Sequence, residues 1–328
     1  MVLLSRLISV LILLAWGTQG QATSYAENPQ ARELIREMVA EQGFDGAELE
    51  ALFAGAVRKD KILEAIARPA EKTKPWYAYR KIFVTDTRTA QGLEFYRLYA
   101  ASLLRAERKY GVPAEIIVAI IGVETRYGRN KGSWRVLDAL STLAFDYPKR
   151  SAFFRRELKE YLLMTREQGL SAAELRGSYA GAMGYGQFIP SSYRAYAVDF
   201  DGDGIIDIID NPVDAIGSVA NYFSRHGWRT GEPVAVPARV GEGYRSEWMN
   251  AGLKPQHTVA ELAANSIYPA QPGAEGARAT AIEFEARRGP EYWLGWHNFY
   301  VITRYNHSSM YAMSVHQLSQ QIEARRSQ

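Results

Sequence analysis

Apolar side chains recur at helical spacing through most of the chain. Between residues 28 and 108 they return every three or four positions, as at Leu34 and Met38, which predicts several helices. The same spacing over residues 90–110 predicts one longer helix, ended by Gly111. The first third of the protein is therefore expected to be helical.

A second group of helices follows. Residues 114–124 are apolar on nearly every side, so this helix should be buried all round. Further helices are predicted over 151–168 and 213–225, and residues 312–322 can form a closing amphipathic helix. The buried helix should lie at the centre of the fold.

The character of the chain changes after Trp228. Residues 231–295 are rich in glycine and proline and contain short β-leaning runs at 234–240 and 279–284. The patterns together predict a mainly α protein of the α+β class, with a small β-containing insertion. The expected divisions are a leader at 1–22, an N-terminal helical domain at 23–100, a helical core at 101–228, a small β-containing domain at 229–291 and a closing segment at 292–328.

Composition and charge narrow the class of protein. The 328 residues are 47% hydrophobic and 23% charged, which is ordinary for a globular protein. The 39 Lys and Arg residues against 36 Asp and Glu residues leave a net charge of +3, too little to neutralise nucleic-acid phosphates at an extended surface. We therefore expect no nucleic-acid partner.

The N-terminus has the pattern of a secretory signal peptide. Arg6 precedes a short apolar run over 7–16, and small or polar residues fill 17–22. An uncleaved N-terminal anchor is the alternative. The chain contains no cysteine, which excludes a disulfide and a lipid-modified cysteine anchor. A soluble periplasmic protein is expected, because disulfides are permitted there but not obligatory.

Glu124 ends the apolar helix and is the candidate acid. Burial by that helix and the negative end of its dipole both disfavour an ionised carboxylate, so we expect a raised pKa if the side chain is buried. A neutral carboxylic acid is what protonation of a glycosidic oxygen requires. The alternative is a structural ion pair between Glu124 and Arg126 or Arg129.

Four blocks of sequence resemble the lytic murein transglycosylase B family. They are IIGVET at 120–125, GAMGYGQFIPSSY at 181–193, AIGSVANYF at 215–223 and NFYVITRYN at 298–306. The resemblance spans about residues 28–321 in one order, which makes it highly specific. The chain differs from lipid-anchored members in having no cysteine after the leader, so it is similar to a soluble member.

The resemblance implies a lysozyme-like helical core and cleavage of the β-1,4 bond between MurNAc and GlcNAc in peptidoglycan. Glu124 would be the catalytic acid/base. The residues that would line the glycan groove are Gln187, Ser191, Tyr222, Asn298, Tyr305 and Asn306. Amides suit hydrogen bonds to sugars, and Tyr305 can stack on a pyranose face, although core packing is the alternative for each aromatic residue.

The matched blocks contain no second acidic residue. Ordinary glycosidases need two carboxylates across the cleft. The family's route dispenses with one, because the substrate's own N-acetyl group and 6-hydroxyl replace the nucleophile and water and give a 1,6-anhydromuramic end. A muramidase that uses water remains the closer alternative, and a non-catalytic peptidoglycan-binding protein the more distant one.

An acidic loop at 199–214 has the pattern of a calcium site. Asp199, Asp201 and Asp203 stand at positions 1, 3 and 5, and Ile205 at position 7 would contribute its carbonyl. Position 12 is Asp210 instead of the usual Glu. The resembled family closes a lengthened loop with a later Asp, which favours Asp214 here as the closing metal ligand. The alternative is an acidic turn that binds no metal; a bound calcium would be structural.

The remaining sequence offers no other chemistry. The five histidines are scattered without metal-ligand spacing, and there is no phosphate-binding loop, dinucleotide fingerprint or Gly-x-Ser-x-Gly elbow. No organic cofactor is therefore expected. The expected partner is the glycan strand of peptidoglycan, and the expected state is a monomer.

Overall fold

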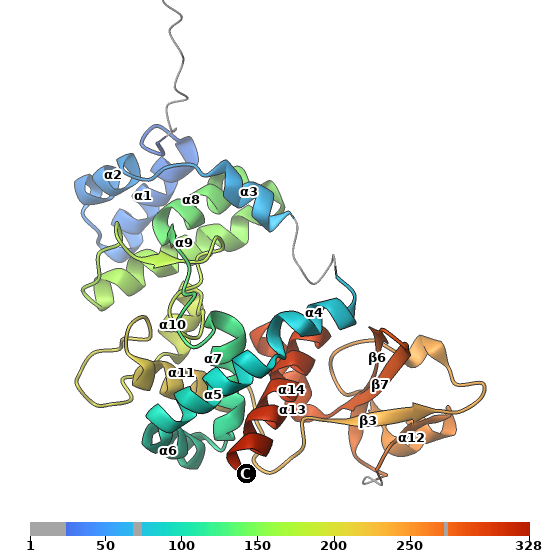
Figure 1. The fold of residues 1–328 in the computed structure, drawn as a ribbon. Coiled ribbons are helices and arrows are strands. Elements are labelled where there is room, and N and C mark those ends of the chain that lie inside the picture. Colours follow the sequence, from blue (N-terminus) through green and yellow to red (C-terminus); the bar gives the residue numbers. More distant parts are fainter. Residues whose placement is uncertain (1–23, 68–73, 272–274) are drawn as a thin grey trace, which may run out of the picture.

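The computed structural model describes residues 24–67, 74–271 and 275–328, so the predicted leader at 1–22 lies outside the described part. Figure 1 shows two helical lobes and a small sheet at one side. The elements are α1 (Pro29–Gln42), α2 (Gly46–Ala54), α3 (Asp60–Ile66), α4 (Trp76–Phe83), α5 (Asp86–Leu98), α6 (Ala100–Tyr110), α7 (Ala114–Thr125), β1 (Trp134–Arg135), α8 (Val136–Asp146), η2 (Pro148–Arg150), α9 (Ser151–Glu167), β2 (Arg176–Gly177), α10 (Pro190–Tyr196), α11 (Pro212–Arg225), β3 (Ala235–Val240), η3 (Ser246–Trp248), β4 (His257–Thr258), α12 (Val259–Ala264), β5 (Ile267–Pro269), β6 (Arg278–Ala286), β7 (Gly289–Gly295), α13 (His297–Tyr305) and α14 (Ser309–Arg326).

The first lobe joins the N-terminal helices to the middle of the chain. Helices α1 and α2 pack together, α3 packs on α8, and α8 packs on α9. Side chains of Asn28 and Asp45 accept backbone N–H groups at the starts of α1 and α2, which satisfies donors that a helix end leaves free. Leu34, Phe53 and Ile62 are fully buried and fill the core of this lobe.

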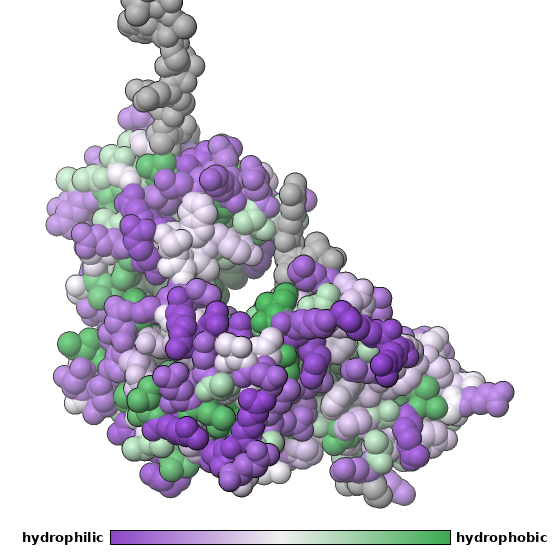
Figure 2. All heavy atoms as spheres, in the orientation of Figure 1, coloured by the Kyte–Doolittle hydropathy of each residue, from purple (hydrophilic) through white to green (hydrophobic). Residues whose placement is uncertain are grey.

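The second lobe surrounds α7. Ten of its twelve residues are buried, which confirms the prediction from its uniform apolar pattern. Helices α5, α6, α11 and α14 all contact α7. The closing helix α14 is buried along Met313, Val315, Leu318 and Ile322, as its spacing predicted. In the space-filling view the surface is hollowed between this lobe and the first (Figure 2).

The prediction of one long helix over 90–110 is wrong, because this segment contains parts of two helices, α5 and α6. The helix is interrupted at Tyr99, whose φ of −117° and ψ of 23° are not helical. The break lets α5 pack on α7 and α14 while α6 packs on α11. Apolar spacing continues through the break, so the sequence pattern alone did not reveal it.

The contacts between helices do not divide the chain at residue 100, where the predicted N-terminal domain would end. Helices α4 and α5 contact α14, and α5 and α6 contact α7, whereas α3 packs on α8 in the other lobe. The predicted N-terminal segment 23–100 therefore contributes to both lobes. Within the described residues, no helix has the length and apolar character needed to cross a membrane.

The small β part is a five-stranded antiparallel sheet of order β4-β6-β7-β3-β5. Its longest pairing, β6 with β7, runs from Thr280 opposite Gly295 to Ala286 opposite Gly289. Leu262 of α12 is fully buried with Ile267 and Leu294 in a separate apolar cluster. These strands confirm the predicted β-leaning runs, and the sheet leads directly into α13.

Candidate active site

Glu124 is the penultimate residue of α7 and is partly exposed. The buried hydroxyl of Tyr311, on α14, donates a hydrogen bond of 2.5 Å to its Oε1. Burial raises the pKa of Tyr311 well above its ordinary value, and the charge of Glu124 raises it further. Tyr311 therefore stays protonated and holds the carboxylate as a permanent donor.

Sequence reasoning did not include Tyr311 among the site residues. It stands five residues after the last matched block, in a stretch where aromatic residues are common. The only feature of the sequence that could have indicated Tyr311 is its closeness to that block. This feature does not distinguish it from aromatic residues of the core such as the buried Phe299.

The turn after Glu124 has an unusual backbone. Arg126, Tyr127 and Gly128 all have positive φ, at 52°, 61° and 82°. Left-handed conformations are costly for residues with a side chain, so the surroundings must hold them. Thr125 is buried beside this turn: its hydroxyl accepts from the Gly128 N–H at 2.9 Å and donates to the Tyr185 carbonyl at 3.0 Å.

The two arginines near Glu124 have partners on α5. Arg126 Nε donates to the side chain of Gln91 at 2.9 Å, and Arg129 lies 3.7 Å from the carboxylate of Glu94.

The glycine-rich segment at 181–193 forms a tight loop beside the end of α7. Gly184 has a φ of 70°, and a Cβ there would lie 2.2 Å from the Ile208 carbonyl. Gln187 also has positive φ, and its amide Nε2 donates to the carbonyls of Gly184 and Lys131 at 2.9 and 3.1 Å. These contacts brace the loop, so the close backbone approach at Gly184 is to the protein itself.

Tyr305 and Tyr222 link that loop to the helices behind it. The Tyr305 hydroxyl donates to the Gly186 carbonyl at 2.5 Å, and its ring stacks on Phe223 with centroids 5.6 Å apart. Burial, with the charge of Glu124 next in size, raises the pKa of Tyr305 well above its ordinary value. Tyr222 is buried, and its hydroxyl donates to the Arg304 carbonyl at 2.6 Å.

Ser191 and Asn298 use their polar groups within the protein. The Ser191 hydroxyl and N–H both bind the buried carboxylate of Glu157, at 2.7 and 3.0 Å. Asn298 is 0% exposed, and its amide makes three hydrogen bonds to the backbone of Arg229 and Glu232. The prediction that Asn298 lines the groove is wrong in this structure, because it has no surface to offer a ligand.

Asn306 directly follows α13 and is partly exposed. Of the six predicted groove residues, Tyr305 and Asn306 therefore lie together at the end of α13. Gln187 lies on the loop that Tyr305 contacts. Ser191, Tyr222 and Asn298 support this arrangement from positions where their polar groups are already bonded.

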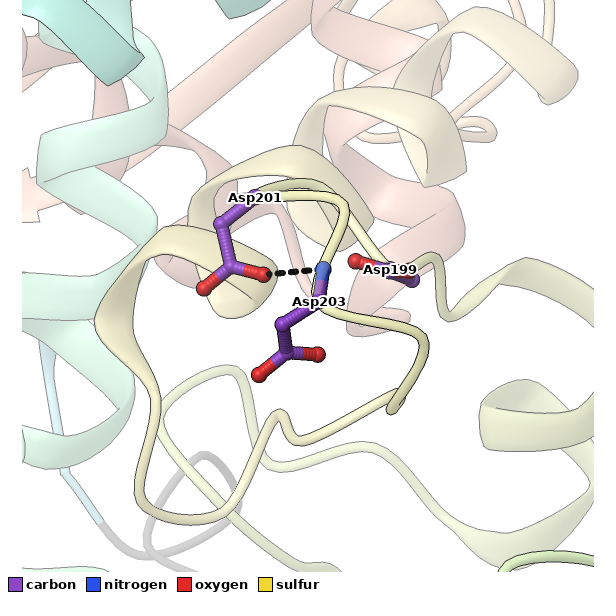
Figure 3. A group of neighbouring side chains, drawn as sticks. All are labelled: Asp199, Asp201 and Asp203. Atoms are coloured by element: carbon purple, nitrogen blue, oxygen red, sulfur yellow. Dashed lines mark hydrogen bonds between the residues drawn. The ribbon is translucent and has the colours of Figure 1, made fainter.

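Three carboxylates of the acidic loop converge (Figure 3). Asp199, Asp201 and Asp203 each offer one carboxylate oxygen, and these three oxygens lie within 4.8 Å of one another. Gly202 and Gly204, with φ of 86° and 92°, give the loop its sharp turns. Hard oxygen donors at this spacing fit a calcium ion, so the residues present match the predicted site.

The two candidates for closing the loop differ sharply. Asp210 is exposed and pairs with Lys131 Nζ at 2.5 Å. Asp214 is fully buried, and its carboxylate accepts the N–H groups of Phe200, Asp201 and Asp207 at 2.7, 3.3 and 2.8 Å. The Asp214 carboxylate therefore ties the loop together by accepting the loop's own backbone N–H groups. The Asp210 carboxylate instead turns outward to Lys131.

Comparison with known proteins gives a consistent result. Residues 26–320 match the family model described as the transglycosylase SLT domain. The chain is 46% identical to the membrane-bound lytic murein transglycosylase B of Escherichia coli over 93% of this chain and 85% of that protein.

Two solved structures are closely similar. Soluble lytic transglycosylase SltB1 of Pseudomonas aeruginosa has 53% identity and a TM-score of 0.87, covering 92% of this chain and 100% of that one. The Escherichia coli lytic transglycosylase Slt35, solved in complex with calcium, has 46% identity and a TM-score of 0.86, covering 94% and 96%.

These matches confirm the expected fold class, a lysozyme-like helical core with a small β part, and the family resemblance. They remove the alternative of a non-catalytic binding protein, because the relatives are enzymes that act on murein. The chain belongs to the SLT-domain family and is a lytic transglycosylase that cleaves peptidoglycan.

Proposed function

We propose that Glu124 is the single acid/base of this transglycosylase and that the product carries a 1,6-anhydromuramic end. The observation that carries the proposal is the Glu124 carboxylate at the end of a buried helix, held by the hydroxyl of Tyr311. The matched sequence blocks supply no second acidic residue. A double-displacement with an enzyme nucleophile would need one.

The proposed chemistry uses one carboxyl group twice, first as an acid and then as a base. Protonated Glu124 gives its proton to the glycosidic oxygen as that bond breaks, while the carbonyl of the substrate's N-acetyl group bonds to the sugar C1. The resulting carboxylate then takes the proton of the 6-hydroxyl, whose oxygen displaces the acetamido oxygen at C1. Glu124 is protonated again, and no water is consumed.

The groove residues take two proposed roles. Tyr305 and Asn306 would contact the glycan, since both are partly exposed; Tyr305 would do so with its ring, because its hydroxyl is bonded to the Gly186 carbonyl. Gln187, Ser191 and Tyr222 would position that loop and its neighbours, because their polar groups are bonded to the protein. The substitution Glu124→Gln tests the central role and is developed in the Discussion.

We also propose a structural calcium ion held by Asp199, Asp201, Asp203 and the carbonyl of Ile205, with Asp214 as the closing ligand. The calcium complex of the similar Slt35 supports this assignment. Because a ligand that binds only the folded state stabilises it, calcium at ~100 times its Kd should add about 2.7 kcal/mol and raise the Tm by several degrees. Differential scanning fluorimetry with calcium or a chelator measures the shift.

The control for calcium is the double substitution Asp201→Ala/Asp203→Ala. It removes two of the three converging carboxylates, so its Tm should be the same with calcium and with chelator. If calcium also fails to change the Tm of the wild-type protein, the proposed calcium site is wrong.

For location, we propose export to the periplasm with removal of the leader, and a soluble monomer. The supporting observation is the short apolar run over 7–16 with no cysteine after it. The mature protein should lack about the first 20 residues. Intact-mass measurement of protein from the periplasmic fraction checks this, and a full-length chain recovered only from membranes would contradict it.

A further inference from the structure

A cavity lies between α4 and the sheet. Its volume is about 680 Å³, and its walls come from α4, β3, β7, the β6–β7 turn and Gln317 of α14. The rings of Tyr77, Tyr292 and Trp293 line it and are all partly exposed. Flat, partly exposed rings with polar tips are well suited to stacking on sugar faces.

The residues that line this cavity carry more positive than negative charge. Arg80, Lys81 and Arg287 line it, and the single acidic residue among its described lining residues is Glu291. Its carboxylate accepts the indole N–H of Trp76 at 3.2 Å and keeps its charge, so the three cations leave the lining with a net positive charge. Lys81 and Arg287 are exposed, so their charges can face a ligand. The cavity therefore favours a ligand that combines sugar rings with carboxylates.

A smaller cavity lies on the other side of Trp76, at the start of α14. It has a volume of about 360 Å³, shares Trp76 with the larger cavity, and reaches Ser309 and Met310. The next residue along α14 is Tyr311, which holds Glu124. Trp76 is a fixed wall between the two cavities, since it is buried and stacks on Phe284 with centroids 4.7 Å apart.

We infer that the cavity between α4 and the sheet is a second binding site for the substrate polymer, taking a segment of the strand remote from the bond that is cut. Peptidoglycan combines sugar rings with the carboxylates of its peptide stems, which matches the rings and cations described above. A long strand can reach this site while it occupies the catalytic groove, and a short fragment cannot. Tethering at two points raises affinity through effective concentration. This inference rests on cleavage at Glu124.

The test reverses the two exposed charges with Lys81→Glu/Arg287→Glu. The ratio of kcat/KM on high-molecular-weight glycan strands to kcat/KM on a short soluble fragment should fall about fivefold, since each exposed ionic contact is worth roughly a few tenths to 1 kcal/mol. The difference should shrink in high salt, which screens exposed charges. The matched control is Arg288→Glu, on the same turn but not lining the cavity, and it should keep the wild-type ratio.

A binding measurement separates this inference from the proposed role of Glu124. Glu124→Gln protein with and without the double reversal is sedimented with purified sacculi, and the double reversal should weaken binding about fivefold at low salt. An unchanged ratio and unchanged sedimentation would overturn the second site even if Glu124→Gln is inactive. The neutral variant Lys81→Gln/Arg287→Gln repeats the test if the reversal lowers the Tm.

Discussion

Glu124→Gln is expected to lower turnover of peptidoglycan by about 10²–10⁴-fold, the usual cost of losing a general acid/base. The amide keeps the size of the side chain and can still accept the hydrogen bond from Tyr311, so the fold around α7 should be preserved. It cannot deliver a proton to the glycosidic oxygen. Turnover is measured by release of soluble fragments from purified sacculi, and binding by sedimentation should survive.

The matched control for this substitution is Glu94→Gln. Glu94 lies on α5, is exposed, and pairs with Arg129 close to the same turn. The same chemical change there should leave turnover near the wild-type value, because an exposed ion pair contributes little. Digestion by Glu124→Gln at the wild-type rate would show that the acid/base lies elsewhere.

Asp214→Ala is expected to destabilise the protein by about 3 kcal/mol, measured in the presence of a chelator. The substitution leaves three backbone N–H groups, those of Phe200, Asp201 and Asp207, without their acceptor. A buried donor that loses its partner costs roughly 1–3 kcal/mol, and some of the three can find water. The Tm should fall by about 5 °C or more.

Asp210→Ala is the control for the loop. Asp210 is exposed and pairs with Lys131 at the surface, so its loss should change the stability by less than about 1 kcal/mol. Equal effects of the two substitutions would contradict the assignment of Asp214 as the residue that closes the loop.

The sequence predicted most of the helical framework because burial leaves a strong apolar pattern. The helix α7 and the strand β6 were readable in this way. The acidic loop was readable as well, because carboxylates at alternate positions followed by glycine are typical of a cation-binding loop. The break at Tyr99 could not be predicted, because apolar spacing continues through it while α5 packs on α14 and α6 on α11, with α7 contacted by both.

Site residues were predicted less completely than the fold. Tyr311 was missed, since its contact with Glu124 joins residues 187 positions apart and nothing local marks it. Asn298 was assigned to the groove by its place in a matched block, but its three bonds to the backbone are tertiary contacts that no local pattern reveals. The chemistry of a side chain indicates which groups it can bind. The fold determines which of those groups lie within its reach.

The measurement that tests the central claim most directly is mass analysis of the ends that the wild-type enzyme produces from purified glycan strands. If the Glu124 carboxylate takes a proton from the 6-hydroxyl, every new muramic end carries a 1,6-anhydro ring and is lighter by one water than a hydrolysis product. Glu124→Gln should then release almost none of these ends. Wild-type digests that contain only reducing ends would contradict the account, because water and not the 6-hydroxyl would have attacked.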